Sequence, residues 1–286
     1  MLVTLKNEKI TMVVSTLGAE PQSLVFEGRE YLWNGDKEYW FRRAPLLFPM
    51  IGPTKDDKIG YQGKEYKMPN NGFARDTEFS LVSQNDREAV FILEDSQETR
   101  ENNYPFGFIL KVTYSLLENG YKAKAEITAK DDLYYTFGWH PAFSLDINGK
   151  GADLETYTLS FEEEEKADRK YAKDGIFEYE KDFLVGDQIE LTRREMDKGP
   201  IILDDIKSSE VTLTSSLGEH GVTVTMGKMK TFTAWTTLNK WAQFLCLEPM
   251  LSFGDTKREF DIDKMKETKL LEKGKTETYE NEFIVF

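Results

Sequence analysis

Short runs in which apolar and polar side chains alternate recur along the whole chain, and this pattern limits the possible folds more than any other feature. A period of two residues is that of a β-strand with one buried face. The helical period of 3.6 residues does not extend beyond about two turns anywhere, and Arg193–Lys198 is the best short candidate. The sequence therefore predicts an all-β protein with little helix. The alternating runs are Ile10–Val14, Glu88–Leu93, Phe108–Leu117, Tyr121–Ala129, Thr156–Phe161, Val211–Ser215 and Val222–Met226.

Turn residues join several of these runs into hairpins. Asn119 and Gly120 stand between the runs Phe108–Leu117 and Tyr121–Ala129. An Asn-Gly pair supplies the positive φ angles that a tight hairpin turn requires. A second hairpin is predicted where Leu217–Gly221 separates the last two runs. Hairpins indicate antiparallel sheets.

The chain has no internal repeat, no Ser/Gly-rich linker and no low-complexity tract apart from the acidic run Glu162–Glu165. We interpret this run as a solvated strand end or loop, because like charges repel one another. Large β-sandwiches of about this length can form one unit. We therefore expect residues 1–286 to form a single domain.

Composition excludes several classes of protein. The chain has 37 Lys and Arg against 51 Asp and Glu, a formal net charge of −14, whereas nucleic-acid binding favours positive charge. Aromatic residues make up 13%, which is typical of a folded chain. The longest stretch without a charged residue, Leu133–Leu145, is too short to span a membrane, and charges interrupt the apolar residues of the N-terminus. We expect a cytoplasmic protein that binds neither nucleic acid nor membranes.

The sequence offers few metal ligands. Cys246 is the only cysteine, and His140 and His220 are the only histidines. A disulfide within the chain, a thiolate cluster and a multi-histidine zinc site are therefore excluded. We expect chemistry that depends on carboxylates, histidine and polar groups, without a metal or a cofactor.

The two histidines differ in their surroundings. His220 lies in the predicted hairpin loop, where we expect an exposed imidazole without a function. His140 lies in Phe137–Phe143, within the least charged stretch of the chain. Burial disfavours the charged imidazolium, so we expect a neutral ring at pH 7. His140 is then either a core residue bonded to the backbone or an acid–base catalyst.

One carboxylate has a comparably apolar setting. A strand over Phe244–Met250 would put Glu248 on the same face as Phe244 and Cys246. An unpaired buried carboxylate costs several kcal/mol. Glu248 is therefore either half of a structural ion pair or a general base with a raised pKa. With His140 it would form an acid–base pair that needs no metal.

Arginines and aromatic residues accompany these motifs. Arg42 and Arg43 interrupt the otherwise apolar segment Trp40–Pro49, and Arg75 closely follows Asn71. A guanidinium can donate a fork of hydrogen bonds to sugar hydroxyls or to an anion, although surface arginines are the alternative. Several aromatic rings either cover the C–H face of a sugar or pack in the core: Trp139, Phe143, Trp235, Trp241 and Phe73.

Six motifs, in order along essentially the whole chain, resemble those of the aldose 1-epimerase (galactose mutarotase) superfamily, particularly its bacterial mutarotase-related branch. The resemblance implies a large, twisted antiparallel β-sandwich, with a small-molecule sugar bound on a concave sheet face. The motifs are Trp40–Pro49, Gly72–Asp76, Tyr104–Phe106, Gly138–Phe143, Leu203–Ser208 and Cys246–Pro249.

The resemblance also implies roles for individual residues. Glu248 would act as general base on the anomeric hydroxyl, and His140 as general acid on the ring oxygen. The ring would open to the aldehyde, rotate about C1–C2 and close to the other anomer. Arg42, Arg75 and Asp204 match further substrate contacts of the family.

The chain departs from the family at two positions. Asn71 stands where the family usually has a histidine that binds substrate, and Met250 replaces a frequent tryptophan. An amide can form hydrogen bonds but cannot carry charge. The leading hypothesis is a hexose mutarotase. A hexose-phosphate 1-epimerase, which the three arginines favour, and a non-catalytic sugar-binding protein, which Asn71 favours, are the alternatives.

Overall fold

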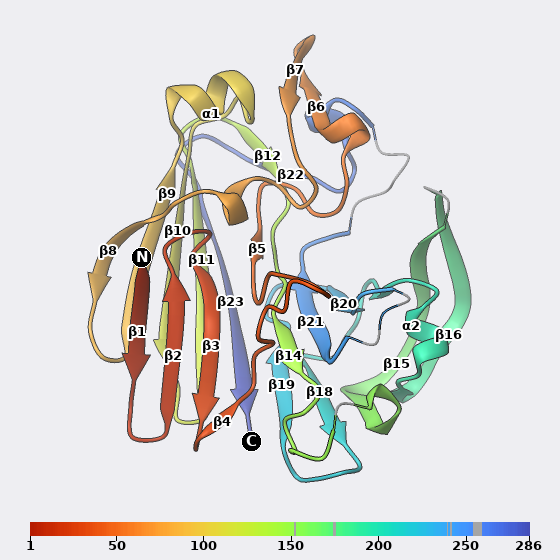
Figure 1. Cartoon of the computed structure of the whole chain (residues 1–286). Coiled ribbons are helices and arrows are strands. Elements are labelled where there is room, and N and C mark those ends of the chain that lie inside the picture. Colours follow the sequence, from red (N-terminus) through yellow and green to blue (C-terminus); the bar gives the residue numbers. More distant parts are fainter. Residues whose placement is uncertain (152, 174–175, 239, 241, 254–258) are drawn as a thin grey trace.

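The computed structural model describes residues 1–151, 153–173, 176–238, 240, 242–253 and 259–286. Strands dominate this part of the chain (Figure 1), and their ladders are antiparallel. The helices α1 (Gln97–Asn102) and α2 (Arg193–Met196) are short. No helix in the described ranges is long and apolar enough to cross a membrane. The prediction of an all-β fold with little helix is confirmed.

The strands of the described residues form one large sheet and three smaller ones. The large sheet has fifteen strands, in the order β5 (Leu46–Leu47), β13 (Gly138–Trp139), β21 (Phe244–Met250), β20 (Thr231–Trp235), β17 (Ile201–Leu203), β15 (Tyr157–Lys173), β18 (Glu210–Ser215), β19 (Gly221–Thr225), β23 (Thr276–Val285), β11 (Gly120–Ala129), β10 (Phe108–Leu116), β9 (Glu88–Glu94) and β8 (Ser80–Gln84), with β14 (Ala142–Ser144) paired to β21 and β16 (Ile176–Glu190) to β15. The four-stranded sheet contains β1 (Leu2–Lys6), β2 (Ile10–Ser15), β3 (Glu20–Phe26) and β4 (Arg29–Glu30), and the two-stranded sheets are β12 (Leu133–Tyr135) with β22 (Lys269–Leu271) and β6 (Lys58–Tyr61) with β7 (Lys64–Lys67).

The four-stranded sheet lies in front of β9, β10, β11 and β23 in Figure 1, and together they form the sandwich. Leu5 and Met12 of this sheet and Val112 of the large sheet are fully buried in one core. Tyr114 of β10 donates a hydrogen bond to the backbone carbonyl of Ala19, at 2.8 Å. This bond satisfies the buried hydroxyl and joins the two layers.

Both predicted hairpins are present. β10 pairs with β11 so that Leu116 lies opposite Tyr121, and burial alternates along both strands as the sequence pattern requires. Ala123 is buried, for example, whereas Lys122 is partly exposed. β18 pairs with β19 in the same manner.

The prediction for the acidic run is right for the solvation of its first three residues but wrong for Glu165 and for the placement at a strand end or in a loop. Glu162–Glu165 lies inside β15, which continues to Lys173. The first three glutamates are exposed, but Glu165 is buried. Its carboxylate accepts hydrogen bonds from the backbone N–H groups of Lys207 (2.8 Å) and Ser208 (2.7 Å) and from the Ser208 hydroxyl (2.8 Å). These three donors replace water, so a charged residue can be buried here.

His220 is half-buried rather than exposed. Its Nδ1 lies 3.1 Å from the carbonyl oxygen of Phe286 and 3.4 Å from the Tyr31 hydroxyl. The end of the chain, which follows β23, covers the hairpin loop, and local sequence gave no sign of this contact.

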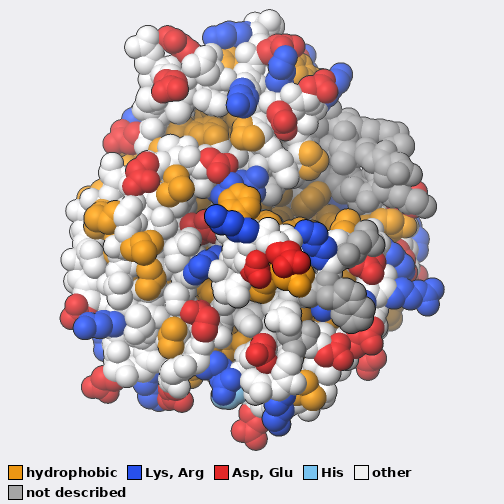
Figure 2. Space-filling model, viewed as in Figure 1, with side chains coloured by type: hydrophobic (Ala, Val, Ile, Leu, Met, Phe, Trp, Pro, Cys, Tyr) orange, Lys and Arg blue, Asp and Glu red, His pale blue; other side chains and the backbone are white. Residues whose placement is uncertain are grey.

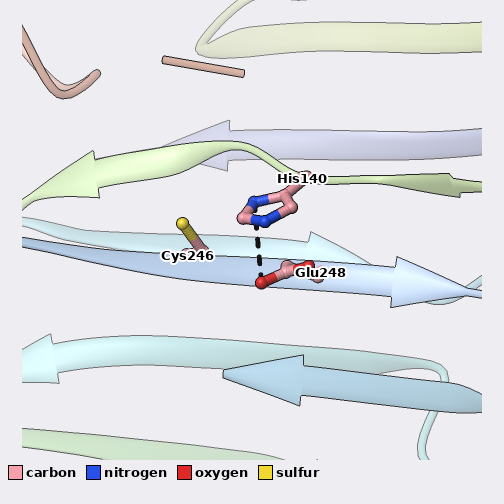
Figure 3. Close-up of side chains that lie close together, drawn as sticks. All are labelled: His140, Cys246 and Glu248. Carbon is pink, nitrogen blue, oxygen red and sulfur yellow. Dashed lines mark ion pairs between the residues drawn. The ribbon is translucent and has the colours of Figure 1, made fainter. Parts of the chain in front are cut away.

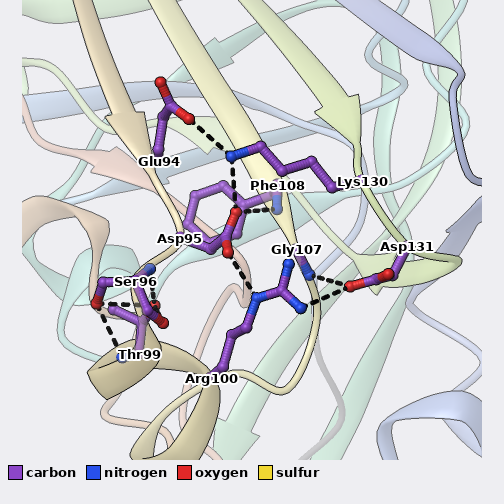
Figure 4. Close-up of polar contacts among 9 residues, drawn as sticks. All are labelled: Glu94, Asp95, Ser96, Thr99, Arg100, Gly107, Phe108, Lys130 and Asp131. Carbon is purple, nitrogen blue, oxygen red and sulfur yellow. Dashed lines mark hydrogen bonds and ion pairs between the residues drawn. The ribbon is translucent and has the colours of Figure 1, made fainter.

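A polar cluster joins β9, α1 and β10 (Figure 4). Asp95 accepts hydrogen bonds from Arg100 Nε at 2.6 Å and from the Phe108 N–H at 2.9 Å, and its carboxylate lies 3.0 Å from Lys130 Nζ. Arg100 also pairs with Asp131, at 3.1 Å. The cluster fixes the start of β10 against the helix.

Candidate active site

The register of the large sheet brings His140 and Glu248 together. β13 and β14 both pair with β21, with Gly138 opposite Met250 and Ala142 opposite Cys246. His140 lies between the two short strands, so the same register puts it opposite Glu248. His140 Nδ1 and Glu248 Oε1 are 3.6 Å apart (Figure 3).

Glu248 lies in a strand of which every residue is buried. Leu245 and Leu247 pack in the main core, whereas Phe244 and Cys246 pack in a separate cluster, as the predicted alternation requires. Only 2% of Glu248 is exposed. Burial raises the pKa of its carboxyl well above the ordinary value. Burial also lowers the pKa of the facing His140 ring, so it favours the neutral forms of both groups over a charged pair.

The His140 ring is held by aromatic neighbours. It stacks on Trp40 with ring centroids 5.0 Å apart and meets the Trp235 ring nearly at right angles, at 5.5 Å. Its backbone N–H donates to the carbonyl of Pro45, at 3.0 Å. Burial, together with the positive charges of Arg75 and Arg42, lowers the pKa of the imidazole to about 3.

A cavity of about 500 Å³ opens over this pair, a size within the usual range for small-molecule sites. Figure 2 shows hydrophobic side chains gathered in a hollow on this face, with basic side chains at its rim. Besides the pair itself, the lining includes Trp40, Trp235, Thr233, Pro200 and Phe253. The cavity thus combines flat apolar walls with a few polar groups.

Several polar atoms that line the cavity are buried and have no hydrogen-bond partner within the described part of the chain. They are Arg75 Nε, His140 Nδ1, Thr237 Oγ1 and Glu248 Oε1. Buried polar groups in folded proteins are normally hydrogen-bonded. Their convergence on one cavity indicates a candidate site for a polar ligand.

Arg42 and Arg75 both reach the cavity. Arg42 Nη2 forms an ion pair with Asp76 Oδ1 at 2.6 Å. Arg75 Nη2 donates to the backbone carbonyl of Asn70, also at 2.6 Å. These contacts hold both guanidinium groups in place.

Asn71 lines the cavity in a left-handed backbone conformation, with φ of 64°. Its Oδ1 accepts a hydrogen bond from the N–H of Gly52, at 2.6 Å. Gly72 follows, with φ of 74°, and a Cβ there would lie 2.1 Å from the carbonyl oxygen of Phe48. Glycine is therefore required for the loop to approach β5 and present Asn71 to the cavity.

Asp204 is not brought to the cavity. It follows β17 and lines a neighbouring cavity that shares only Phe253 with the first. Because β17 pairs with β15, its carboxylate meets Lys170, at 2.8 Å, and it also accepts a hydrogen bond from Thr231, at 2.9 Å.

Most of the other residues proposed from the sequence as sugar contacts also lie away from the cavity. Arg43 does not line the cavity, and its Nη1 donates to the carbonyl of Gln22. Of the proposed aromatic surfaces, Trp235 lines the cavity and Trp241 falls outside the described residues, whereas the others are buried in the core: Trp139, Phe143 and Phe73.

Some cavity residues were not singled out from the sequence. Trp40 had a signal, because it begins the motif that contains Arg42. Thr233 had none, since it reaches the site only by pairing with Glu248 across β20 and β21.

His140, Cys246 and Glu248 offer ligand atoms within 4.8 Å of one another (Figure 3). Burial raises the pKa values of both the Cys246 thiol and the Glu248 carboxyl, so both would have to lose a proton to bind a metal ion. Arg42 and Arg75 nearby also repel cations. The arrangement therefore suits proton transfer better than metal binding.

The fold and the site define a large antiparallel β-sandwich that holds a buried carboxyl–imidazole pair in a cavity on its main sheet. The chain belongs to the aldose 1-epimerase family, whose family model matches residues 1–252. It is 31% identical to the plasmid protein LacX of Lactococcus lactis subsp. lactis, over 95% of both chains.

Solved structures agree with this membership. A galactose mutarotase-like protein from Lactobacillus casei has a TM-score of 0.92 and 28% identity over 100% of both chains. A galactose mutarotase related enzyme from Lactobacillus acidophilus has a TM-score of 0.92 and 25% identity, over 100% of this chain and 97% of that chain. The family predicted from the motifs is confirmed.

Proposed function

We propose that this protein interconverts the α and β anomers of a hexose, with Glu248 as general base and His140 as general acid. The observation that carries the proposal is the 3.6 Å approach of His140 Nδ1 to Glu248 Oε1 on the lining of a cavity. Opening a hemiacetal requires a proton to leave O1 while another reaches O5. A base and an acid that face one sugar ring meet this requirement, and each contributes about 10²–10⁴-fold.

The proton count of the pair fits this reaction. In ring opening, Glu248 takes the proton from O1, the C1–O1 bond becomes a carbonyl, the C1–O5 bond breaks, and His140 gives a proton to O5. This leaves a protonated Glu248 and a neutral His140, the forms that burial favours. Ring closure reverses both transfers.

A new opening step starts from an ionised Glu248 and a protonated His140. These are the same two groups with the same single proton placed on the other partner. Ring closure restores this charged form, so the catalytic cycle needs no proton exchange with solvent. Only entry into the cycle from the neutral pair requires the proton to pass from Glu248 to His140.

The remaining lining supports a sugar ring. Trp40 and Trp235 offer apolar faces to its C–H side, and Arg75 and the Asn71 NH₂ group offer donors to its hydroxyls. Asn71 thus retains the hydrogen-bonding part of the role that a histidine has in the family, without the charge.

The test is a time course of optical rotation that starts from pure α-D-glucose or α-D-galactose. We expect the protein to accelerate equilibration, and Glu248→Gln and His140→Asn each to reduce the acceleration by about 10²–10⁴-fold. Glu165→Gln, a change at a buried glutamate outside the cavity, is the matched control and should leave the rate near that of the unaltered protein. Saturable sugar binding without acceleration would instead identify a non-catalytic sugar-binding protein.

A further inference from the structure

The charged groups on the cavity lining are unbalanced. Among the described lining residues, the basic side chains are Arg42 and Arg75, and the carboxyl is Glu248. Burial raises the pKa of Glu248 and lowers that of His140, and the pair carries no net charge whichever of the two holds the shared proton. The cavity is thus positively charged, although the whole chain carries a formal net charge of −14.

The neighbouring carboxylates offset this charge only in part. Asp76 lies 2.6 Å from Arg42 Nη2 but 3.9 Å from Arg75 Nε, so one half-exposed carboxylate serves two guanidinium groups. Buried Glu20 accepts hydrogen bonds from the backbone N–H groups of Arg43 (2.7 Å) and Ala44 (3.0 Å), and its charge is shared among Arg42, Arg43 and Arg75. Arg75 Nε remains buried without a hydrogen-bond partner in the described residues.

We propose that the sugar bound in this cavity carries a negative charge, a phosphate or a carboxylate, which Arg42 and Arg75 bind. This inference rests on the proposed function and names the substrate class for it. Guanidinium groups form paired, charge-assisted hydrogen bonds with both kinds of anion. A neutral hexose would leave the excess positive charge in the cavity uncompensated.

The electrostatics of the site agree with an anionic ligand. Burial and the neighbouring charge of Arg42 lower the pKa of Arg75 to about 10. The same two arginines lower the pKa of His140. A bound anion would offset both effects and make it easier for His140 to hold the proton that ring opening requires.

The experiment compares neutral sugars with their charged counterparts. Exchange NMR of the anomeric protons at equilibrium measures the rate for D-glucose, D-galactose, their 6-phosphates, D-glucuronate and D-galacturonate. The rate with the Glu248→Gln protein at the same concentration is the baseline. We expect kcat/KM of at least one charged sugar to exceed that of its neutral parent by about tenfold or more. Faster phosphates would identify a phosphate site, and faster uronates a carboxylate site.

Matched arginine variants test which residues recognise the charge. Arg75→Gln should reduce the ratio of charged to neutral kcat/KM by about 10- to 100-fold, the effect of losing a charge-assisted hydrogen bond. Arg43→Gln removes a neighbouring arginine that does not line the cavity and should leave the ratio unchanged. Added sodium chloride should slow the charged sugar more than the neutral one.

Two results would overturn the inference: neutral parents that exchange as fast as all four charged sugars, or an Arg75→Gln protein with an unchanged ratio. Neither result affects the proposed mutarotase activity, which fails only if none of the six sugars exchanges faster with the unaltered protein than at the baseline.

Discussion

His140 and Glu248 face each other at 3.6 Å in the neutral forms that burial favours for both. The sheet achieves this by interrupting one strand. His140 and Pro141 separate β13 from β14, while β21 runs past both without a break. The imidazole therefore lies opposite the carboxyl and also contacts Trp40 and Trp235.

Glu248→Gln should stabilise the protein at neutral pH. The folded state raises the pKa of Glu248 above its ordinary 4.5, so above that pH the folded protein binds a proton that the unfolded chain releases. The free energy of unfolding then falls as pH rises, by about 1.4 kcal/mol per pH unit up to the folded pKa. Glutamine does not titrate, so the Glu248→Gln protein does not lose this free energy as pH rises. Thermal unfolding at pH 7.5 should show a Tm higher by about 2–4 °C or more.

The pH dependence separates this effect from ordinary packing. Below the ordinary pKa of Glu248, the variant and the unaltered protein should have similar Tm values, because both side chains are then neutral in both states. Glu165→Gln should behave oppositely and lower Tm at pH 7.5, since Glu165 accepts three hydrogen bonds. A Glu248→Gln protein that is equally destabilised at every pH would contradict the prediction.

The sequence predicted the parts of the fold that depend on local patterns. The hairpin of β10 and β11 followed from alternation and an Asn-Gly turn. The two faces of β21 followed from the spacing of Leu245, Leu247 and Cys246. Apolar surroundings identified His140 and Glu248 as candidates, and the ordered motifs identified the family. The single-domain interpretation stays a prediction.

Contacts between distant segments were outside the reach of local patterns. Glu165 appeared to belong to a solvated acidic run, because its donors come from Lys207 and Ser208. His220 was predicted to be exposed, because the residue that contacts its ring is Phe286, which is distant in the sequence. Asp204 matched a motif, yet the pairing of β17 with β15 directs it to Lys170. The contacts of all three residues depend on how strands that are distant in the sequence pair with one another.

The pH profile of mutarotation should lack an inflection near the ordinary pKa of histidine. Burial and Arg75 lower the pKa of His140 to about 3, so kcat/KM with a neutral sugar should show no histidine step between about pH 5 and 8. Arg75→Gln removes a positive charge and should move the acid limb to higher pH, whereas Arg43→Gln should not. An inflection near pH 6.5 in the unaltered protein would show that His140 is hydrated and contradict the assignment.

Asp95→Asn should destabilise the protein at neutral pH by about 1–3 kcal/mol. Burial alone would raise the pKa of Asp95, but hydrogen bonds from Arg100, Lys130 and the Phe108 N–H outweigh it and lower the pKa. The carboxylate therefore contributes stability above its ordinary pKa, and this contribution is lost as pH falls through the folded value. Urea unfolding at pH 7 and pH 3 measures the difference between the two proteins, which should shrink at the lower pH.

The matched control is Glu94→Gln. Glu94 also pairs with Lys130, at 2.7 Å, but its side chain is 54% exposed. Exposed ion pairs contribute about 0–1 kcal/mol, so this variant should stay close to the unaltered protein. If both variants lose the same stability, the cluster of Figure 4 acts only through the charge of Lys130.

Asn71→Ala should weaken both folding and sugar binding. The change leaves the Gly52 N–H without its hydrogen-bond acceptor, which costs about 1–3 kcal/mol of folding free energy. It also puts alanine at a φ of 64°, which costs about 1–2 kcal/mol more. Asn71→Gly removes the same hydrogen bond without the backbone cost, so the difference between the two variants in urea unfolding isolates the strain. KM for the sugar should rise in both, because both lose the NH₂ donor. Asn70→Ala changes the exposed neighbour, which also lines the cavity. It should leave the free energy of unfolding unchanged and raise KM less than Asn71→Ala does; if it weakens binding as much, the loop rather than the Asn71 amide determines KM.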